Sequence, residues 1–221
     1  NALAIVMDPN NGELLGIGSR PDYDPNNYQK SSQKVLNRNL PVFSSYEPGS
    51  TFKIVTMATA LEEKVISLND SFYDSGSVKV DGSTLRCWKA GGHGSQTFLQ
   101  VLENSCNPGF VKIGQLLGKE TLFSYLDKFG FGAKTKVDLS GESTGIIFPL
   151  EKVGNVELAT TAFGQGVSVT PIQQVTAVSS VVNGGNLYKP YIVKRIAEPN
   201  TKEIMKENKP TIVKKVISNE T

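Results

Sequence analysis

The segment that most constrains the fold runs from Glu47 to Val65, where a Pro-Gly turn leads into an almost uninterrupted apolar run. A helix that is apolar on nearly every side belongs in a protein interior. Ser50 falls in its predicted first turn, where the positive end of the helix dipole favours an alkoxide. Lys53 follows on the same face, one turn along. Because a desolvated lysine can accept a serine proton, the segment predicts an activated nucleophile.

Two short motifs each occur twice, so neither is specific alone. The second Ser-x-x-Lys, residues 31–34, stands in a polar segment with no apolar helix behind it, so nothing there lowers the lysine pKa. For Ser-x-Asn, we interpret residues 67–69 as a turn after the helix. Residues 105–107 are predicted to lie at a turn between two helices, marked by Pro108-Gly109, where polar side chains can face a cleft.

Short strands and helices are predicted along the rest of the chain. Residues 2–18 predict a β-hairpin around Asp-Pro-Asn-Asn-Gly, and residues 19–47 a long connecting segment. Thr170 and Pro171 have the pattern of a helix N-terminus. The helices predicted from spacing cover 97–102, 110–117, 120–129 and 170–182, and strand-like runs cover 191–196 and 212–216.

Composition excludes several classes of function. The chain has 221 residues, 38% hydrophobic and 20% charged, and a formal net charge of +2. These values are ordinary for a globular domain, and no basic cluster indicates a nucleic-acid partner. No apolar run is long enough to cross a bilayer. Because the chain opens at Asn1 without an initiator methionine, we expect it to be a piece of something longer.

The order of three motifs resembles class B penicillin-binding proteins. Residues 48–53 (Pro-Gly-Ser-Thr-Phe-Lys), 104–108 (Asn-Ser-Cys-Asn-Pro) and 163–166 (Phe-Gly-Gln-Gly, before Thr-Pro-Ile-Gln at 170–173) follow the order of their transpeptidase domain. The opening residues 5–26 also resemble the start of that domain, so the similarity spans the chain. Within the family the chain most resembles the sporulation-type proteins of Gram-positive spore formers.

The resemblance implies an α+β fold with helices packed on an antiparallel sheet, as in penicillin-binding proteins and β-lactamases. It implies that Ser50 is the acylated nucleophile and Lys53 its general base. Ser105 would relay a proton toward the leaving amine, and Asn107 would hold the substrate amide carbonyl and the lysine. Gly164 to Gly166 would shape the wall of the cleft.

The third motif of the family, Lys-Thr/Ser-Gly on a strand lining the cleft, does not occur; Lys134-Thr135-Lys136 is only a near miss, upstream of the expected place. We therefore expect residues 1–221 to be a partial transpeptidase domain that lacks the third-motif strand, the last strands of the sheet and the C-terminal end. The missing strand would supply a carboxylate-binding lysine and an oxyanion donor.

Cys87, His93 and Cys106 lie within 20 residues of one another. With a carboxylate such as Asp74 they could bind a structural zinc ion, which the chemistry itself does not require. Some elongation-type class B relatives carry a zinc with similar ligands near the second motif. Cys106 should point away from the cleft, so that a metal would brace the turn from behind. A Cys87–Cys106 disulfide, or two buried free thiols, are the alternatives.

The function implied by the resemblance is a serine D,D-transpeptidase that cross-links peptidoglycan stem peptides ending in D-Ala-D-Ala and is acylated by β-lactams, with a role in spore cortex synthesis. A division or elongation role is the first alternative; a serine β-lactamase or β-lactam sensor and a non-catalytic scaffold are the others. The expected location is the extracytoplasmic face of the cell membrane, anchored by an N-terminal segment outside these residues, with a glycosyltransferase partner.

Overall fold

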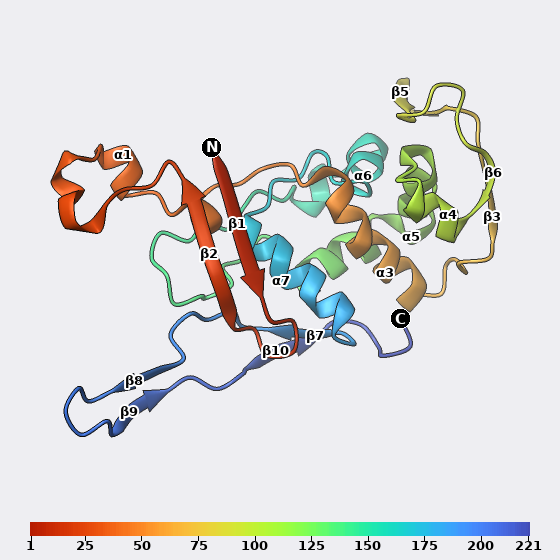
Figure 1. Ribbon diagram of the computed structural model, residues 1–221. Coiled ribbons are helices and arrows are strands. Elements are labelled where there is room, and N and C mark those ends of the chain that lie inside the picture. Colours follow the sequence, from red (N-terminus) through yellow and green to blue (C-terminus); the bar gives the residue numbers. More distant parts are fainter.

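The computed structural model describes all 221 residues as a mixed α+β fold (Figure 1). The α-helices are α1 Gln33–Leu36, α2 Leu40–Phe43, α3 Lys53–Glu62, α4 Phe98–Glu103, α5 Asn107–Lys128, α6 Asn155–Thr161 and α7 Pro171–Val182. Three 3₁₀ helices cover η1 Pro25–Lys30, η2 Gly49–Phe52 and η3 Leu150–Lys152. The strands are β1 Ala2–Met7, β2 Leu14–Arg20, β3 Ser71–Asp74, β4 Ser77–Val80, β5 Ser83–Arg86, β6 Gly94–Thr97, β7 Asn186–Tyr188, β8 Arg195–Ala197, β9 Ile204–Glu207 and β10 Ile212–Lys215.

The strands form five antiparallel pairs: β1–β2, β3–β6, β4–β5, β7–β10 and β8–β9. The predicted N-terminal hairpin is confirmed, with Ile5 opposite Ile17. Its turn is held by Asp8, whose carboxylate accepts hydrogen bonds from Asn10 and Asn11. In Figure 1 the hairpin lies beside α7, while the β8–β9 pair projects away from the helices.

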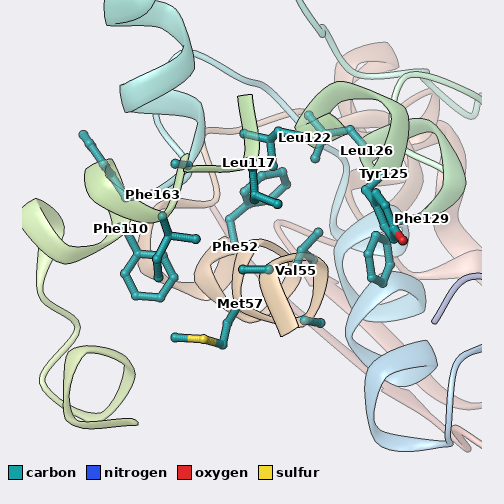
Figure 2. Packing of buried hydrophobic residues seen from close by; sticks show 14 of the residues in the cluster. Phe52, Val55, Met57, Phe110, Leu117, Leu122, Tyr125, Leu126, Phe129 and Phe163 are labelled. Carbon is teal, nitrogen blue, oxygen red and sulfur yellow. The ribbon is translucent and has the colours of Figure 1, made fainter. Parts of the chain in front are cut away.

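Helix α3 lies at the centre of the molecule, as its apolar composition predicts. Phe52, Val55 and Ala60 are fully buried, and Figure 2 shows the first two among side chains of α5. Helices α4, α5 and α7 all contact α3. The core around it comprises 30 buried residues. Each Å² of apolar surface that leaves water stabilises the fold by roughly 25 cal/mol. Packing of this core around α3 therefore holds the helix in place, and with it Ser50 and Lys53 at its start.

The structure corrects the prediction for Pro108 and Gly109. They are not a turn between helices but belong to the first turn of α5. Proline is accepted there because the first helical N–H groups have no partner within the helix. Gly109 is required by packing, since a Cβ atom on it would lie 2.4 Å from Val101 Cγ1 of α4. The predicted division of the later helix is present, because Gly118 leaves helical geometry with φ of 74° and ψ of 162°.

Two further differences concern short elements. Helix α6 was not predicted, although Glu157 accepts a hydrogen bond from the Gly154 N–H at its start, which is a recognisable capping pattern. The strand predicted at 191–196 is correct only for its last two residues, because β7 ends at Tyr188 and β8 begins at Arg195. Pro190 lacks an N–H for a strand ladder, and Tyr191 forms only a single parallel bridge with Glu13. None of the helices has the length and apolar content that a membrane crossing needs.

Candidate active site

Ser50 lies in η2, immediately before α3, with an exposed side chain. The turn is set by Gly49, whose φ of 54° favours glycine, and by the Gly49 N–H, which donates to the Gly164 carbonyl at 2.9 Å. Glu47 strengthens the same junction, since its carboxylate accepts from the Gly166 N–H at 3.0 Å. The segment 164–166 therefore packs directly against the loop that carries Ser50.

Lys53 is the first residue of α3, and its side chain is almost completely buried. Its Nζ donates to Ser105 O at 2.8 Å, to Ser105 Oγ at 3.0 Å and to Asn107 Oδ1 at 2.7 Å. The Phe110 ring centroid lies 5.3 Å from the same nitrogen. Burial lowers the pKa of Lys53 from 10.5 to about 8, so the neutral amine is much more populated near neutral pH than in an exposed lysine.

Ser105 links the other two groups. Its Oγ donates to Ser50 Oγ at 2.8 Å and accepts from Lys53, and no direct hydrogen bond joins Ser50 to Lys53. Its backbone has φ of 50°, a left-handed conformation that is unfavourable for serine. Two features stabilise this conformation: the hydrogen bond from Lys53 Nζ to the Ser105 carbonyl, and helix α5, which begins two residues later at Asn107. A continuous chain of polar groups thus runs from Ser50 through Ser105 to Lys53.

Asn107 opens α5 and places both ends of its side-chain amide in hydrogen bonds. Oδ1 accepts from Lys53, and Nδ2 donates to the Arg86 carbonyl at 3.2 Å, at the end of β5. All four residues predicted for the catalytic site are therefore in one place. The second copy of each motif lies elsewhere. In the second Ser-x-x-Lys, Lys34 is exposed in α1. In the other Ser-x-Asn, residues 67–69 form a turn with Asp70.

The four predicted metal ligands also come together. The ligand atoms of Asp74, Cys87, His93 and Cys106 all lie within 4.8 Å of one another. His93 Nδ1 is 2.9 Å from Asp74 Oδ2 and 3.3 Å from Cys87 Sγ, and Cys106 Sγ is 3.3 Å from Asp74 Oδ2. Neighbouring ligands around a tetrahedral zinc ion are roughly 3.3–3.8 Å apart, given bonds of about 2.0–2.3 Å. The four ligand atoms therefore form a group that could hold a metal ion.

Burial governs the protonation of this cluster. It raises the pKa of Cys87 and raises that of Cys106 to about 12, and the Asp74 carboxylate adds to both effects. Burial alone would also raise the pKa of Asp74, but hydrogen bonds from His93 and the Gly76 amide hold it well below its usual range. Both cysteines are free thiols. Cys106 is fully buried between Ser105 and Asn107 in the chain, and its Sγ lies 3.3 Å from Asp74 Oδ2.

Sequence reasoning missed three residues that hold the Ser105 turn. Trp88 Nε1 donates to the Asn104 carbonyl at 2.8 Å. The Asn104 side chain donates to Gln96 Oε1 at 3.0 Å, and Gln96 is buried. The one available signal for Trp88 was its place beside Cys87; Asn104 and Gln96 carry no signal of their own, because their bonds join segments that only the fold brings together.

The model of the penicillin-binding protein transpeptidase domain matches residues 2–221. The chain belongs to this family. It is 63% identical to stage V sporulation protein D of Bacillus subtilis, over 99% of this chain and 34% of that protein. It is 32% identical to penicillin-binding protein PbpB of Mycolicibacterium smegmatis, over 100% of this chain and again 34% of the relative. The chain thus spans about a third of the length of these relatives, and the class B resemblance is confirmed.

Solved structures confirm the fold. Penicillin-binding protein 3 of Mycobacterium tuberculosis, solved in complex with aztreonam, matches with a TM-score of 0.89 and 29% identity over 99% of this chain and 48% of that one. The D,D-transpeptidase domain of a peptidoglycan glycosyltransferase from Eggerthella lenta matches with a TM-score of 0.89 and 26% identity, over 99% and 57% of the two chains. The α+β transpeptidase fold predicted from the motifs is therefore correct.

Proposed function

We propose that these residues form the nucleophile-bearing part of a serine D,D-transpeptidase that cross-links peptidoglycan stem peptides. The observation that carries the proposal is the hydrogen-bonded chain from Ser50 through Ser105 to the buried Lys53. A serine needs a base within reach, and a lysine with a lowered pKa can be one at neutral pH. Its pKa of about 8 suits that task.

In the first half-reaction Lys53 is neutral, and both serine hydroxyls turn to reverse the hydrogen bonds of the resting site, so that Ser50 donates to Ser105 and Ser105 donates to Lys53. Lys53 then accepts the proton of Ser50 through Ser105, and Ser50 Oγ attacks the carbonyl carbon between the two D-alanines. The C–N bond breaks, and Ser105 passes the proton from Lys53 to the departing D-alanine amine. In the second half-reaction, an amine of a neighbouring stem attacks the acyl-serine, loses its proton along the same path and releases Ser50. Asn107 orients the lysine through its amide oxygen, and we propose that the same side chain also holds the donor peptide.

These residues do not supply every group that the reaction needs. Without the third motif, the carboxylate-binding lysine and one oxyanion donor must come from a further polypeptide segment, so we propose that residues 1–221 are a partial domain. The open apolar groove lined by Ile5, Ile54 and Val178, at the edge strand β1, suits a strand that completes the sheet. Removing one oxyanion donor typically costs a factor of 10²–10³ in rate.

The test is acylation by a fluorescent penicillin. We expect the 221-residue chain to react roughly 10²-fold more slowly than a protein extended through its Lys-Thr/Ser-Gly segment, with no labelling of Ser50→Ala in either form. The extended protein should release D-alanine from a D-Ala-D-Ala peptide. Rapid stoichiometric labelling of the short chain would contradict the partial-domain proposal, and turnover of penicillin would favour a β-lactamase instead.

The relatives support a proposal for the cellular role. The identity of 63% to a stage V sporulation protein supports cortex synthesis over a division role. A transpeptidase of this kind acts on the extracytoplasmic face of the membrane, so we propose that location, with an anchor and a glycosyltransferase partner outside these residues. Ser50→Ala in the complete protein is expected to stop cortex formation; normal spores would favour a non-catalytic scaffold.

We also propose that Asp74, Cys87, His93 and Cys106 hold a structural zinc ion. The support is a set of four largely buried ligand atoms, one of which belongs to Cys106, the residue directly after Ser105. A zinc ion would replace the protons of both thiols and brace the turn without entering the reaction. We expect one zinc per chain by elemental analysis and two thiols that react only after chelation. Two freely reactive thiols without metal would contradict zinc. Two cysteines that react only after treatment with a reductant would indicate the disulfide.

A further inference from the structure

A cavity of about 430 Å³ lies outside the group of catalytic residues. It is enclosed by the end of α5 and the following loop to residue 136, the first turns of α7, and the strands β7 and β10, which run side by side next to α7 in Figure 1. None of the four catalytic-site residues lines it. Its volume falls in the range of small-molecule sites, about 300–1,000 Å³.

The inner wall of this cavity is apolar. Buried Phe129 and Leu187 contribute to it, together with Pro190, half-buried Tyr188 and, on β10, exposed Val213. Apolar side chains arranged around a hollow favour a ligand with an apolar or aromatic body, because such a body leaves water on binding.

The rim of the cavity is cationic. Lys134, Lys136, Lys189 and Lys214 all line it, against a single carboxylate, Asp127. Lys214 lies 3.4 Å from that carboxylate, and the other three lysines make no ion pair. An excess of positive charge around an apolar hollow attracts an anion.

The loop that carries Lys134 and Lys136 is held in place by hydrogen bonds within the protein. The Glu142 carboxylate accepts from the Thr135 N–H and Oγ, both at 2.6 Å, and from the Lys136 N–H at 3.1 Å. These bonds stabilise Lys136 at φ of 62°, which is unfavourable for lysine. Fully buried Gln173 fixes the same loop through the Ala133 carbonyl, at 2.7 Å. Preorganisation of this kind lowers the entropic cost of binding.

We infer that this cavity binds an amphiphilic anion, whose apolar body lies on the Phe129–Leu187 wall and whose carboxylate or phosphate lies among Lys134, Lys136 and Lys189. The Lys134-Thr135-Lys136 segment, a near miss for the third catalytic motif in sequence, thus has a binding role of its own. The inference is independent of the reaction at Ser50.

The test uses 1-anilinonaphthalene-8-sulfonate, an aromatic anion that fluoresces in apolar sites, with the folded 221-residue chain. We expect saturable binding of one probe per chain that weakens with salt. Lys134→Gln/Lys136→Gln should weaken it about tenfold, whereas Lys79→Gln/Lys152→Gln, at exposed sites elsewhere, should leave it unchanged. The neutral analogue N-phenyl-1-naphthylamine should bind the wild type and both variants with equal affinity.

Val213→Glu, at an exposed position of the wall, should also block the probe, and circular dichroism would verify that each variant is folded. Decanoate and decyl phosphate as competitors distinguish a carboxylate from a phosphate ligand, and displacement by either one supports the inference. Equal binding to the wild type and the Lys134/Lys136 variant, or no displacement by either competitor, would overturn it.

Discussion

Replacing Lys53 by methionine is expected to slow acylation of Ser50 by at least about 10³-fold, while the protein stays folded. The substitution keeps an unbranched side chain of similar size in the buried position, but it removes the group that accepts the serine proton. The measurement is the acylation rate with a fluorescent penicillin. Lys34→Met, in the exposed second Ser-x-x-Lys, is the matched control and should change nothing. A loss of less than about tenfold at Lys53 would contradict its role as the base.

The pH dependence adds a second readout for Lys53. Because the neutral amine is the reactive form, the wild-type acylation rate should rise with pH up to about 8 and level off above it. Between about 8 and 10.5, the unfolded chain binds a proton at this position that the folded protein does not. The free energy of unfolding of the wild type, relative to Lys53→Met, should therefore increase with pH across this window. A constant difference in urea unfolding would contradict the lowered pKa.

Replacing Gly164 by alanine is expected to destabilise the protein by about 3 kcal/mol or more. A Cβ atom there would lie 2.2 Å from the Gly49 carbonyl oxygen and 2.7 Å from Phe52 Cβ, and φ is 80°. The backbone conformation alone costs about 1–2 kcal/mol for alanine. The remainder comes from pushing away the loop that carries Ser50, so acylation should fall as well.

A control at Gly82 separates the cost of the backbone conformation from the cost of the contact with the Ser50 loop. Its φ of 82° matches that of Gly164, but a Cβ atom there would meet nothing within 4 Å. Gly82→Ala should therefore cost only about 1 kcal/mol and leave acylation unchanged. The measurement is urea unfolding of both variants at one pH. Equal losses for the two variants would show that contact between segment 164–166 and the Ser50 loop contributes nothing.

Local signals were sufficient for much of the fold. The start of α7 is an example: Thr170 accepts from the Gln173 N–H while the Gln173 side chain accepts from the Thr170 N–H, a capping box that sequence spacing alone indicates. The N-terminal hairpin and the buried helix α3 are similar cases, because turn chemistry and an apolar pattern are properties of a few neighbouring residues.

Residues whose role depends on distant contacts were beyond such reasoning. Gly109 was interpreted as a turn residue, yet it is glycine because Val101 of another helix packs against it. The route from Ser50 to Lys53 was expected to be direct, whereas it passes through Ser105, 55 residues along the chain from Ser50. The anchoring of the Ser105 turn by Trp88 likewise spans 16 residues. These contacts join residues that are far apart in the sequence, and only packing of the whole fold brings them together. Local propensity contains no information about them.

The most direct test of the central claim is to locate the covalent adduct by mass spectrometry. The protein extended through its Lys-Thr/Ser-Gly segment is incubated with benzylpenicillin, denatured and digested, and each serine-containing peptide is examined. Our account predicts one penicilloyl group per chain, on the peptide that contains Ser50, and none in Ser50→Ala. An adduct on Ser31 or Ser105, or no adduct on the wild-type protein, would contradict it.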